Sequence, residues 1–103
     1  MKAETLKGHL DALILATLRE GPAHGYAVIE ELKQRSGGAF DLAEGTVYPV
    51  LHRLEADGLL ASAWSTAGRR RRVYRLTRRG RAGLVAQRGE WQSFARAVEA
   101  VLA

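Results

Sequence analysis

Four consecutive arginines, Arg69 to Arg72, lie where two short strands should meet in the second half of this 103-residue chain. Residues 60–66 and 71–76 predict antiparallel strands, and the Thr-Ala-Gly sequence at 66–68 has the residues of a turn. A helix is expected immediately before them, from about Gly45 to Asp57. A helix followed by an arginine-tipped hairpin is an arrangement suited to binding a duplex.

The rest of the chain predicts helices. Apolar residues recur at helical spacing from about Glu4 to Glu20, from Gly25 to Arg35, and from Arg78 to Leu102. Thr77 is the expected N-cap of the last helix. The predicted fold class is mainly α with a small β-hairpin, namely a winged helix-turn-helix domain (1–77) followed by a C-terminal dimerisation helix (78–103).

Positive charge is concentrated in one segment. Residues 1–57 have a net charge of −3, residues 58–89 carry nine arginines and no acid, and residues 90–103 have a net charge of −1. A concentrated patch of arginine is typical of a protein that binds nucleic acid. A charge run alone can equally be a solvated face that keeps the protein soluble.

Several classes of function are disfavoured. The chain has no cysteine, and its three histidines are far apart, so no metal site or cofactor is expected. No residue pattern supports a named reaction, and the chain is not expected to be an enzyme. It has no apolar run long enough to span a bilayer and no signal-peptide pattern, so a cytoplasmic location is expected.

The helix at 45–57 is the candidate recognition helix. Thr46, Tyr48 and Pro49 lie on its exposed N-terminal face and Arg53 lies further along, and in a helix-turn-helix such residues reach base edges. The alternative is that Tyr48 packs in the protein and Arg53 is a solvated charge.

Two further segments could contact the DNA backbone. The sequence PAHGYAV at 22–28 opens the second helix, where free N–H groups and the Tyr26 hydroxyl could hold a phosphate. His24 could assist or could simply cap the helix. On the hairpin, Arg70 and Arg72 should share one face while Arg69 and Arg71 share the other, so not all four can meet one DNA strand.

The last helix carries an apolar stripe with the spacing of a helix that packs on another helix. Trp91 lies in the middle of this stripe and is either an aromatic residue of a dimer interface or the wall of a pocket for a flat ligand. Trp64, on the first strand, is expected to be structural. The stripe consists of Leu84, Arg88, Trp91, Ala95, Val98 and Leu102, and it is widened by Phe94 and Val101.

Three runs, HGYAVIEEL, EGTVYPVLHRLEADGLL and GRRRRVYRLTRRG, resemble the PadR family of bacterial transcriptional regulators over about residues 10–82. The single terminal helix is similar to the short subfamily. The resemblance implies a dimeric repressor that binds a pseudo-palindromic operator and that a small aromatic or drug-like effector can release. One departure is Ala43, where many members have a serine that can cap the recognition helix.

The resemblance also implies roles for individual residues. It implies that Thr46, Tyr48 and Pro49 enter the major groove, that Tyr26 contacts a phosphate, and that the tip at Arg69 to Arg72 contacts DNA. It implies that Trp91 takes part in effector binding. It implies a homodimer built through the first and last helices, with an interface at Leu6, Leu10, Leu84, Trp91, Phe94, Val98 and Leu102. A different hypothesis is a winged-helix module that binds an acidic protein or an effector without sequence-specific DNA binding.

Overall fold

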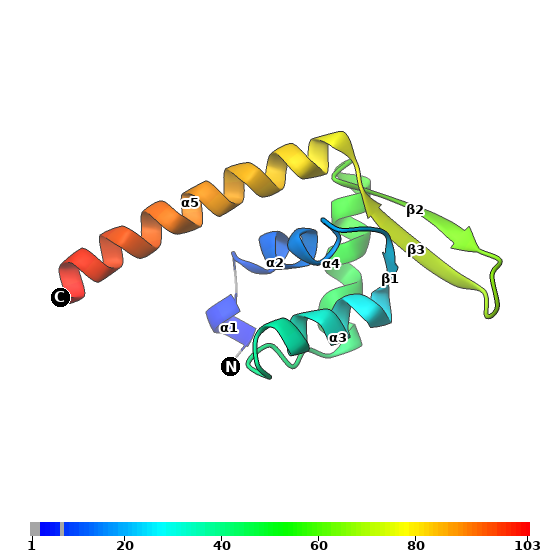
Figure 1. Cartoon of the computed structure of the whole chain (residues 1–103), viewed down its shortest axis with the longest axis horizontal. Coiled ribbons are helices and arrows are strands. Elements are labelled where there is room, and N and C mark those ends of the chain that lie inside the picture. Colours follow the sequence, from blue (N-terminus) through cyan, green and yellow to red (C-terminus); the bar gives the residue numbers. More distant parts are fainter. Residues whose placement is uncertain (1–2, 7) are drawn as a thin grey trace.

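The computed structural model describes residues 3–6 and 8–103, and it has the predicted architecture of a winged helix-turn-helix with an added C-terminal helix (Figure 1). The elements in chain order are α1 (Ala3–Leu6), α2 (Leu10–Thr17), β1 (Ala23–His24), α3 (Gly25–Arg35), α4 (Glu44–Ala56), β2 (Leu60–Ser65), β3 (Arg71–Leu76) and α5 (Arg78–Leu102).

The core lies between α2, α3, α4 and the inner end of the hairpin. Because each helix places apolar residues on one face, the helices bury these faces against one another. Tyr74 and Leu60 continue the core onto the strands, where both are almost completely buried. The rest of the core consists of Leu6, Ile14, Leu15, Leu18, Val28, Ile29, Leu32, Leu42, Val47, Leu51, Leu54, Leu76 and Leu84.

The hairpin belongs to a three-stranded antiparallel sheet with the order β1-β3-β2. Trp64 on β2 lies opposite Arg72 on β3, and on the other side of β3 His24 of β1 lies opposite Val73. The sequence did not predict β1, because a two-residue strand is too short to show an alternating pattern. This strand ties the start of α3 directly to the hairpin.

The predicted continuous first helix from Glu4 to Glu20 is wrong. The chain forms α1 and α2 with a break between them, where Gly8 has a φ of 87°. This left-handed conformation interrupts the helical hydrogen bonds and is accessible to glycine at little cost. The second half also ends earlier than expected, at Thr17 rather than near Glu20.

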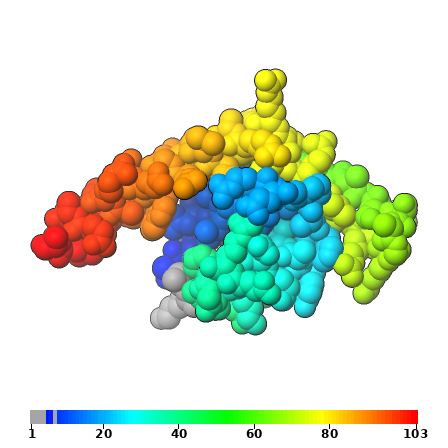
Figure 2. All heavy atoms as spheres, viewed as in Figure 1, coloured from blue at the N-terminus to red at the C-terminus, as the bar shows by residue number. Residues whose placement is uncertain are grey.

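α5 begins where Thr77 caps it, as predicted, with its hydroxyl accepting a hydrogen bond from the Gly80 N–H at 3.0 Å. The first half of the helix packs on α2. Its second half projects beyond the core, while the hairpin projects from the opposite end of the molecule (Figures 1 and 2). Within residues 3–6 and 8–103, Trp91 of this half meets the His9 ring, while Phe94, Val101 and Leu102 stay 56%, 84% and 73% exposed.

Candidate nucleic-acid interface

The start of α3 and the first half of α4 approach each other closely at Gly25 and Tyr48. The Tyr48 ring lies so near the Gly25 backbone that a Cβ atom added at Gly25 would be 2.6 Å from two ring carbons. Only glycine permits this approach without displacement of the ring. Tyr48 is half-buried as a result, so the contact fixes where the tyrosine lies on the recognition helix α4.

His24 connects α3 to the hairpin. Its Nδ1 accepts a hydrogen bond from the Ala27 N–H at 3.2 Å, which makes it the N-cap of α3 and confirms the capping interpretation. Its Nε2 lies 2.6 Å from Nη1 of Arg71 on β3. Burial lowers the pKa of His24 below its ordinary value of 6.5, and the positive charge of Arg71 lowers this pKa further.

These two contacts of His24 compete. The Ala27 N–H and the Arg71 guanidinium can only donate, whereas a neutral imidazole has one nitrogen that accepts and one that donates. The ring can therefore satisfy the helix or the arginine, but not both at once. The Ala27 N–H belongs to the backbone of α3 and cannot move to another acceptor without disturbing the helix. The Arg71 side chain can move, so it is the partner that can exchange His24 for another acceptor at the smaller energetic cost.

The Trp64 ring contacts two arginines on one face of the hairpin. The Arg70 guanidinium carbon lies 4.5 Å from the centre of the Trp64 ring, and that of Arg72 lies 5.4 Å from it. Both distances fall within the range of a cation–π interaction. The predicted alternation is thus observed for three of the four arginines, with Arg70 and Arg72 on the face of Trp64 and Arg71 reaching His24.

Glu55 of α4 anchors this face of the hairpin to the recognition helix. Its carboxylate accepts a hydrogen bond from the Ser62 hydroxyl at 2.5 Å and lies 3.7 Å from the Arg72 guanidinium. Burial raises the pKa of the neighbouring Tyr74 hydroxyl, and the charge of Glu55 adds to this increase. Contacts to both β2 and β3 from one helix residue set the angle between hairpin and helix.

The other residues of α3 and α4 that were predicted to contact DNA are exposed or half-buried. Tyr26 is 56% exposed at the start of α3 and stacks beside His24, with their ring centres 6.5 Å apart. Pro49 is exposed and Thr46 is half-buried near the start of α4. Ala43 provides no side-chain cap, so the first N–H groups of α4 have no side-chain acceptor from that residue.

Arg53 lies on the exposed side of α4, as expected, and it also pairs with an acid of α2. Its guanidinium forms a bidentate pair with the Asp11 carboxylate of α2, with distances of 3.1 and 2.5 Å. The Asp11 hydrogen bond and charge raise the pKa of Arg53, and Asp57 adds a smaller contribution. The structure therefore gives Arg53 a role in holding α4 against α2, while its side chain stays 51% exposed, and a contact of Arg53 with DNA stays a prediction.

The residues expected in a dimer interface divide into two groups. Leu6 and Leu84 are buried within the protomer and Leu10 is partly buried, so they offer little surface to a partner. On the projecting half of α5, by contrast, Trp91 is 50% and Phe94 is 56% exposed, and the Trp91 ring meets His9 edge-on at 5.1 Å. The other members of the second group are Val98, which is partly exposed, and Leu102, which is exposed.

Within residues 3–6 and 8–103, no three metal-binding side chains of His, Cys, Asp or Glu come together. No helix in this described part of the chain combines the length and the apolar character needed to cross a membrane.

Comparison with known proteins gives a consistent result. Residues 14–86 match the family described as Transcriptional regulator PadR-like family. The chain is 43% identical over 86 residues to Transcriptional regulator Rv3488 of Mycobacterium tuberculosis (strain ATCC 25618 / H37Rv), and the match covers 82% of this chain and 78% of that protein.

Solved structures are similar over most of the chain. A transcriptional regulator from Clostridium thermocellum has a TM-score of 0.91 at 25% identity, covering 98% of this chain and 100% of that one. Bacillus subtilis PadR, solved in complex with operator DNA, has a TM-score of 0.70 at 26% identity, covering 77% of this chain and 46% of that one.

Proposed function

This chain belongs to the Transcriptional regulator PadR-like family, and we propose that it acts as a homodimeric repressor that binds an operator in double-stranded DNA. The observation that carries the proposal is the joining of three elements around His24 and Gly25. Tyr26 starts α3, Tyr48 of α4 packs on Gly25, and Arg71 of the hairpin reaches His24. The operator complex of the structurally similar Bacillus subtilis PadR supports it.

Each element has its own task in this proposal. Thr46, Tyr48 and Pro49 at the start of α4 contact base edges in the major groove. Tyr26 and the N-terminus of α3 hold a phosphate. Arg69 to Arg72 meet the backbone or a narrow minor groove and supply most of the salt-dependent affinity.

The dimer forms through α5 in the same proposal. Trp91, Phe94, Val98 and Leu102 project from the core on a helix that also contains Gly89, and a helix of this kind needs packing to persist. Residues 1–77 are then the DNA-binding domain and 78–103 the dimerisation helix, although Leu84 contributes to the core of the former. A two-fold dimer places its half-sites about one helical turn apart, roughly 34–36 Å. A regulator of this kind acts in the cytoplasm, where the bacterial chromosome lies.

The effector expected from the family's properties would contact Trp91. A planar aromatic compound that stacks on this residue should quench its fluorescence. Trp64 also fluoresces, so the control is Trp91→Phe, in which the quench should disappear while the signal of Trp64 remains. An equal quench in both proteins removes Trp91 from an effector site.

The proposal is tested with DNA from upstream of the protein's own gene. A duplex that contains an inverted repeat from that region is compared with a scrambled duplex of equal composition, with binding measured by fluorescence anisotropy. Tyr48→Ala should reduce the discrimination between the two duplexes by about ten- to a hundredfold, because the removal of one base contact costs about 1–3 kcal/mol.

The matched control is Gln34→Ala, an exposed position near the far end of α3, which should leave discrimination unchanged. Binding of both duplexes with no preference contradicts sequence-specific recognition. A complete absence of DNA binding at about 50 mM salt, where nonspecific contacts are strong, favours the alternative of a module that binds an acidic partner.

A further inference from the structure

The outward face of the recognition helix α4 has very few groups that can form a hydrogen bond. Val47, Leu51 and Leu54 are buried, so the opposite side of the helix faces away from the core. Four exposed residues lie there at the i, i+4, i+7, i+11 spacing of one helical face, namely Gly45, Pro49, His52 and Ala56. Glycine, proline and alanine have no polar side-chain atom, so His52 is the hydrogen-bonding side chain of this face.

The residues on the two flanks of this face already have contacts within the protein. On one flank, the Arg53 guanidinium donates hydrogen bonds to the Asp11 carboxylate. On the other flank, the Tyr48 ring lies against the Gly25 backbone. The exposed His52 side chain forms no hydrogen bond or ion pair among the residues that the structure describes, so both of its ring nitrogens are available to a ligand.

The Tyr48 ring limits where the imidazole of His52 can lie. The two residues are one helical turn apart, and their ring centres are separated by 6.4 Å with an angle of 59° between the planes. This separation is typical of a pair of aromatic rings in contact. Because Tyr48 is itself held at Gly25, the imidazole is confined on that side. A confined side chain loses less freedom on binding than a mobile one does.

We propose that His52 reads a guanine in the major groove, by donating a hydrogen bond from its imidazole to the guanine N7 atom. This inference rests on the proposed binding of α4 to an operator. In either charge state the imidazole has at least one N–H that can donate. Guanine presents two acceptors in the major groove, N7 and O6, whereas adenine presents a donor beside its N7 and is therefore the poorer partner of an N–H.

The position of His52 along α4 gives it a base pair of its own. It lies about 4.5 Å further along the helix axis than Pro49, since each residue of an α-helix rises by about 1.5 Å. That distance exceeds the rise of one base pair, which is about 3.4 Å. His52 therefore adds a contact to those proposed for Thr46, Tyr48 and Pro49 and does not duplicate them.

The test combines a protein substitution with a base substitution in a double-mutant cycle. The inverted-repeat duplex is prepared with one guanine of each half-site replaced by 7-deazaguanine, which lacks the N7 acceptor and keeps Watson–Crick pairing. Each guanine position is replaced in turn, and binding of wild type and His52→Ala is measured by fluorescence anisotropy. At one position the replacement should weaken wild-type binding by about three- to tenfold per half-site, because one hydrogen bond is lost. The same replacement should have no effect on His52→Ala.

Two controls separate this contact from an effect on folding. His52→Ala should unfold at the wild-type temperature or slightly above it, because the exposed ring has no hydrogen bond to lose and alanine favours the helix. Gln34→Ala, at an exposed position on α3, should respond to 7-deazaguanine as the wild-type protein does.

Other outcomes overturn the inference. A 7-deazaguanine effect that persists undiminished in His52→Ala at every position would show that other residues read the guanines. Equal losses of His52→Ala affinity for the inverted repeat and for the scrambled duplex would show a contact with the DNA backbone instead. If the wild-type protein does not prefer the inverted repeat at all, the proposed function fails together with this inference, whereas the first two outcomes leave the proposed function standing.

Discussion

At the scale of single residues, Gly25 controls the position of the tyrosine that is proposed to read DNA. Sequence alone suggested that Tyr48 either packs in the protein or faces DNA, and the structure allows both. One part of the ring lies on the Gly25 backbone while the residue stays half-buried rather than enclosed. The glycine directly before Tyr26 is conspicuous in the sequence only as a possible helix start, so its contact with α4 could not be predicted.

Gly25→Ala should therefore impair DNA binding more than folding. The new methyl group would overlap the Tyr48 ring and force it to move, at a cost of about 1–3 kcal/mol in stability. Operator affinity should fall further than this destabilisation explains, because Tyr48 is displaced in every folded molecule. Urea unfolding and anisotropy titration measure the two effects. Gly45→Ala, where an added Cβ has no neighbour, is the control for stability and should not destabilise the protein.

His24 should make stability depend on pH. Its pKa in the folded protein is below 6.5, because burial and Arg71 disfavour the charged ring. The unfolded chain therefore takes up a proton first as the pH falls through about 6.5, and the free energy of unfolding should decrease there. His24→Asn keeps a side chain that can cap α3 but does not titrate at this pH. Urea unfolding from pH 8 to pH 5 should show a smaller decrease in this variant, and equal decreases would assign the effect to another group.

At the scale of elements, the hairpin is fixed to the recognition helix through its side chains. Glu55 holds Arg72 and Ser62, and Trp64 holds Arg70 and Arg72. The alternation of the arginines could be predicted from the strand pattern. The role of Trp64 could not, because it depends on the register that places Trp64 opposite Arg72.

Trp64→Leu should weaken DNA binding while the fold is retained, because Trp64 is 52% exposed and contributes little to the core. An exposed cation–π contact contributes about 0.5–1 kcal/mol. DNA affinity should therefore decrease by about two- to fivefold for each arginine that Trp64 no longer orients. Trp64→Tyr retains an aromatic face and should recover most of the affinity. In a double-mutant cycle with Arg70→Gln, additive effects would show that Trp64 does not act through this arginine.

α5 was predicted with its bounds and its cap, since its apolar stripe and Thr77 both belong to the local sequence. The interruption between α1 and α2 was not predicted, because the apolar spacing continues across Gly8 and hides the change in backbone direction. Similarly, the pairing of Arg53 with Asp11 joins residues 42 positions apart and depends on how α4 packs on α2.

Phe94→Lys with Val98→Lys should dissociate the proposed dimer. Both positions lie on the projecting stripe, and burying two charges there in place of apolar groups should weaken association by at least about a hundredfold. Sedimentation equilibrium measures the change. Ala100→Lys, an exposed position on the opposite side of the helix, should leave association unaffected. A dimer that persists unchanged in the double variant would require a different interface.

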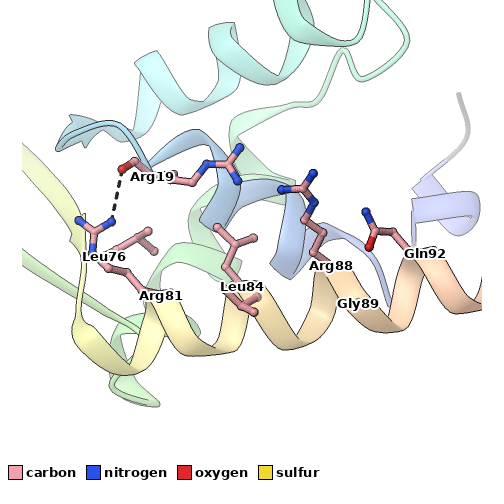
Figure 3. Close-up of a pocket in the computed structure, with 8 residues that line it drawn as sticks. Arg19, Leu76, Arg81, Leu84, Arg88, Gly89 and Gln92 are labelled. Atoms are coloured by element: carbon pink, nitrogen blue, oxygen red, sulfur yellow. Dashed lines mark hydrogen bonds between the residues drawn. The ribbon is translucent and has the colours of Figure 1, made fainter.

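At the scale of the whole molecule, the basic hairpin and the exposed apolar half of α5 lie at opposite ends. The hairpin with its four-arginine run projects from one end, and the exposed apolar half of α5 projects from the other (Figures 1 and 2). The acid-free segment at 58–89 indicated the first of these from sequence. It did not indicate that Arg81 of the same segment reaches the Arg19 carbonyl oxygen (Figure 3), because that contact depends on which way α5 packs.

The salt dependence of DNA binding tests the central claim most directly. For the wild-type protein and for Arg70→Ala with Arg71→Ala, operator affinity is measured across a series of salt concentrations. Lys33→Ala with Arg96→Ala removes the same charge elsewhere and is the control. The account predicts a slope of log affinity against log salt that is flatter by about one unit for each phosphate that the hairpin variant no longer binds, with no such change in the control. An unchanged slope in the hairpin variant, or an equal change in the control, would contradict the assignment of the arginine hairpin to DNA.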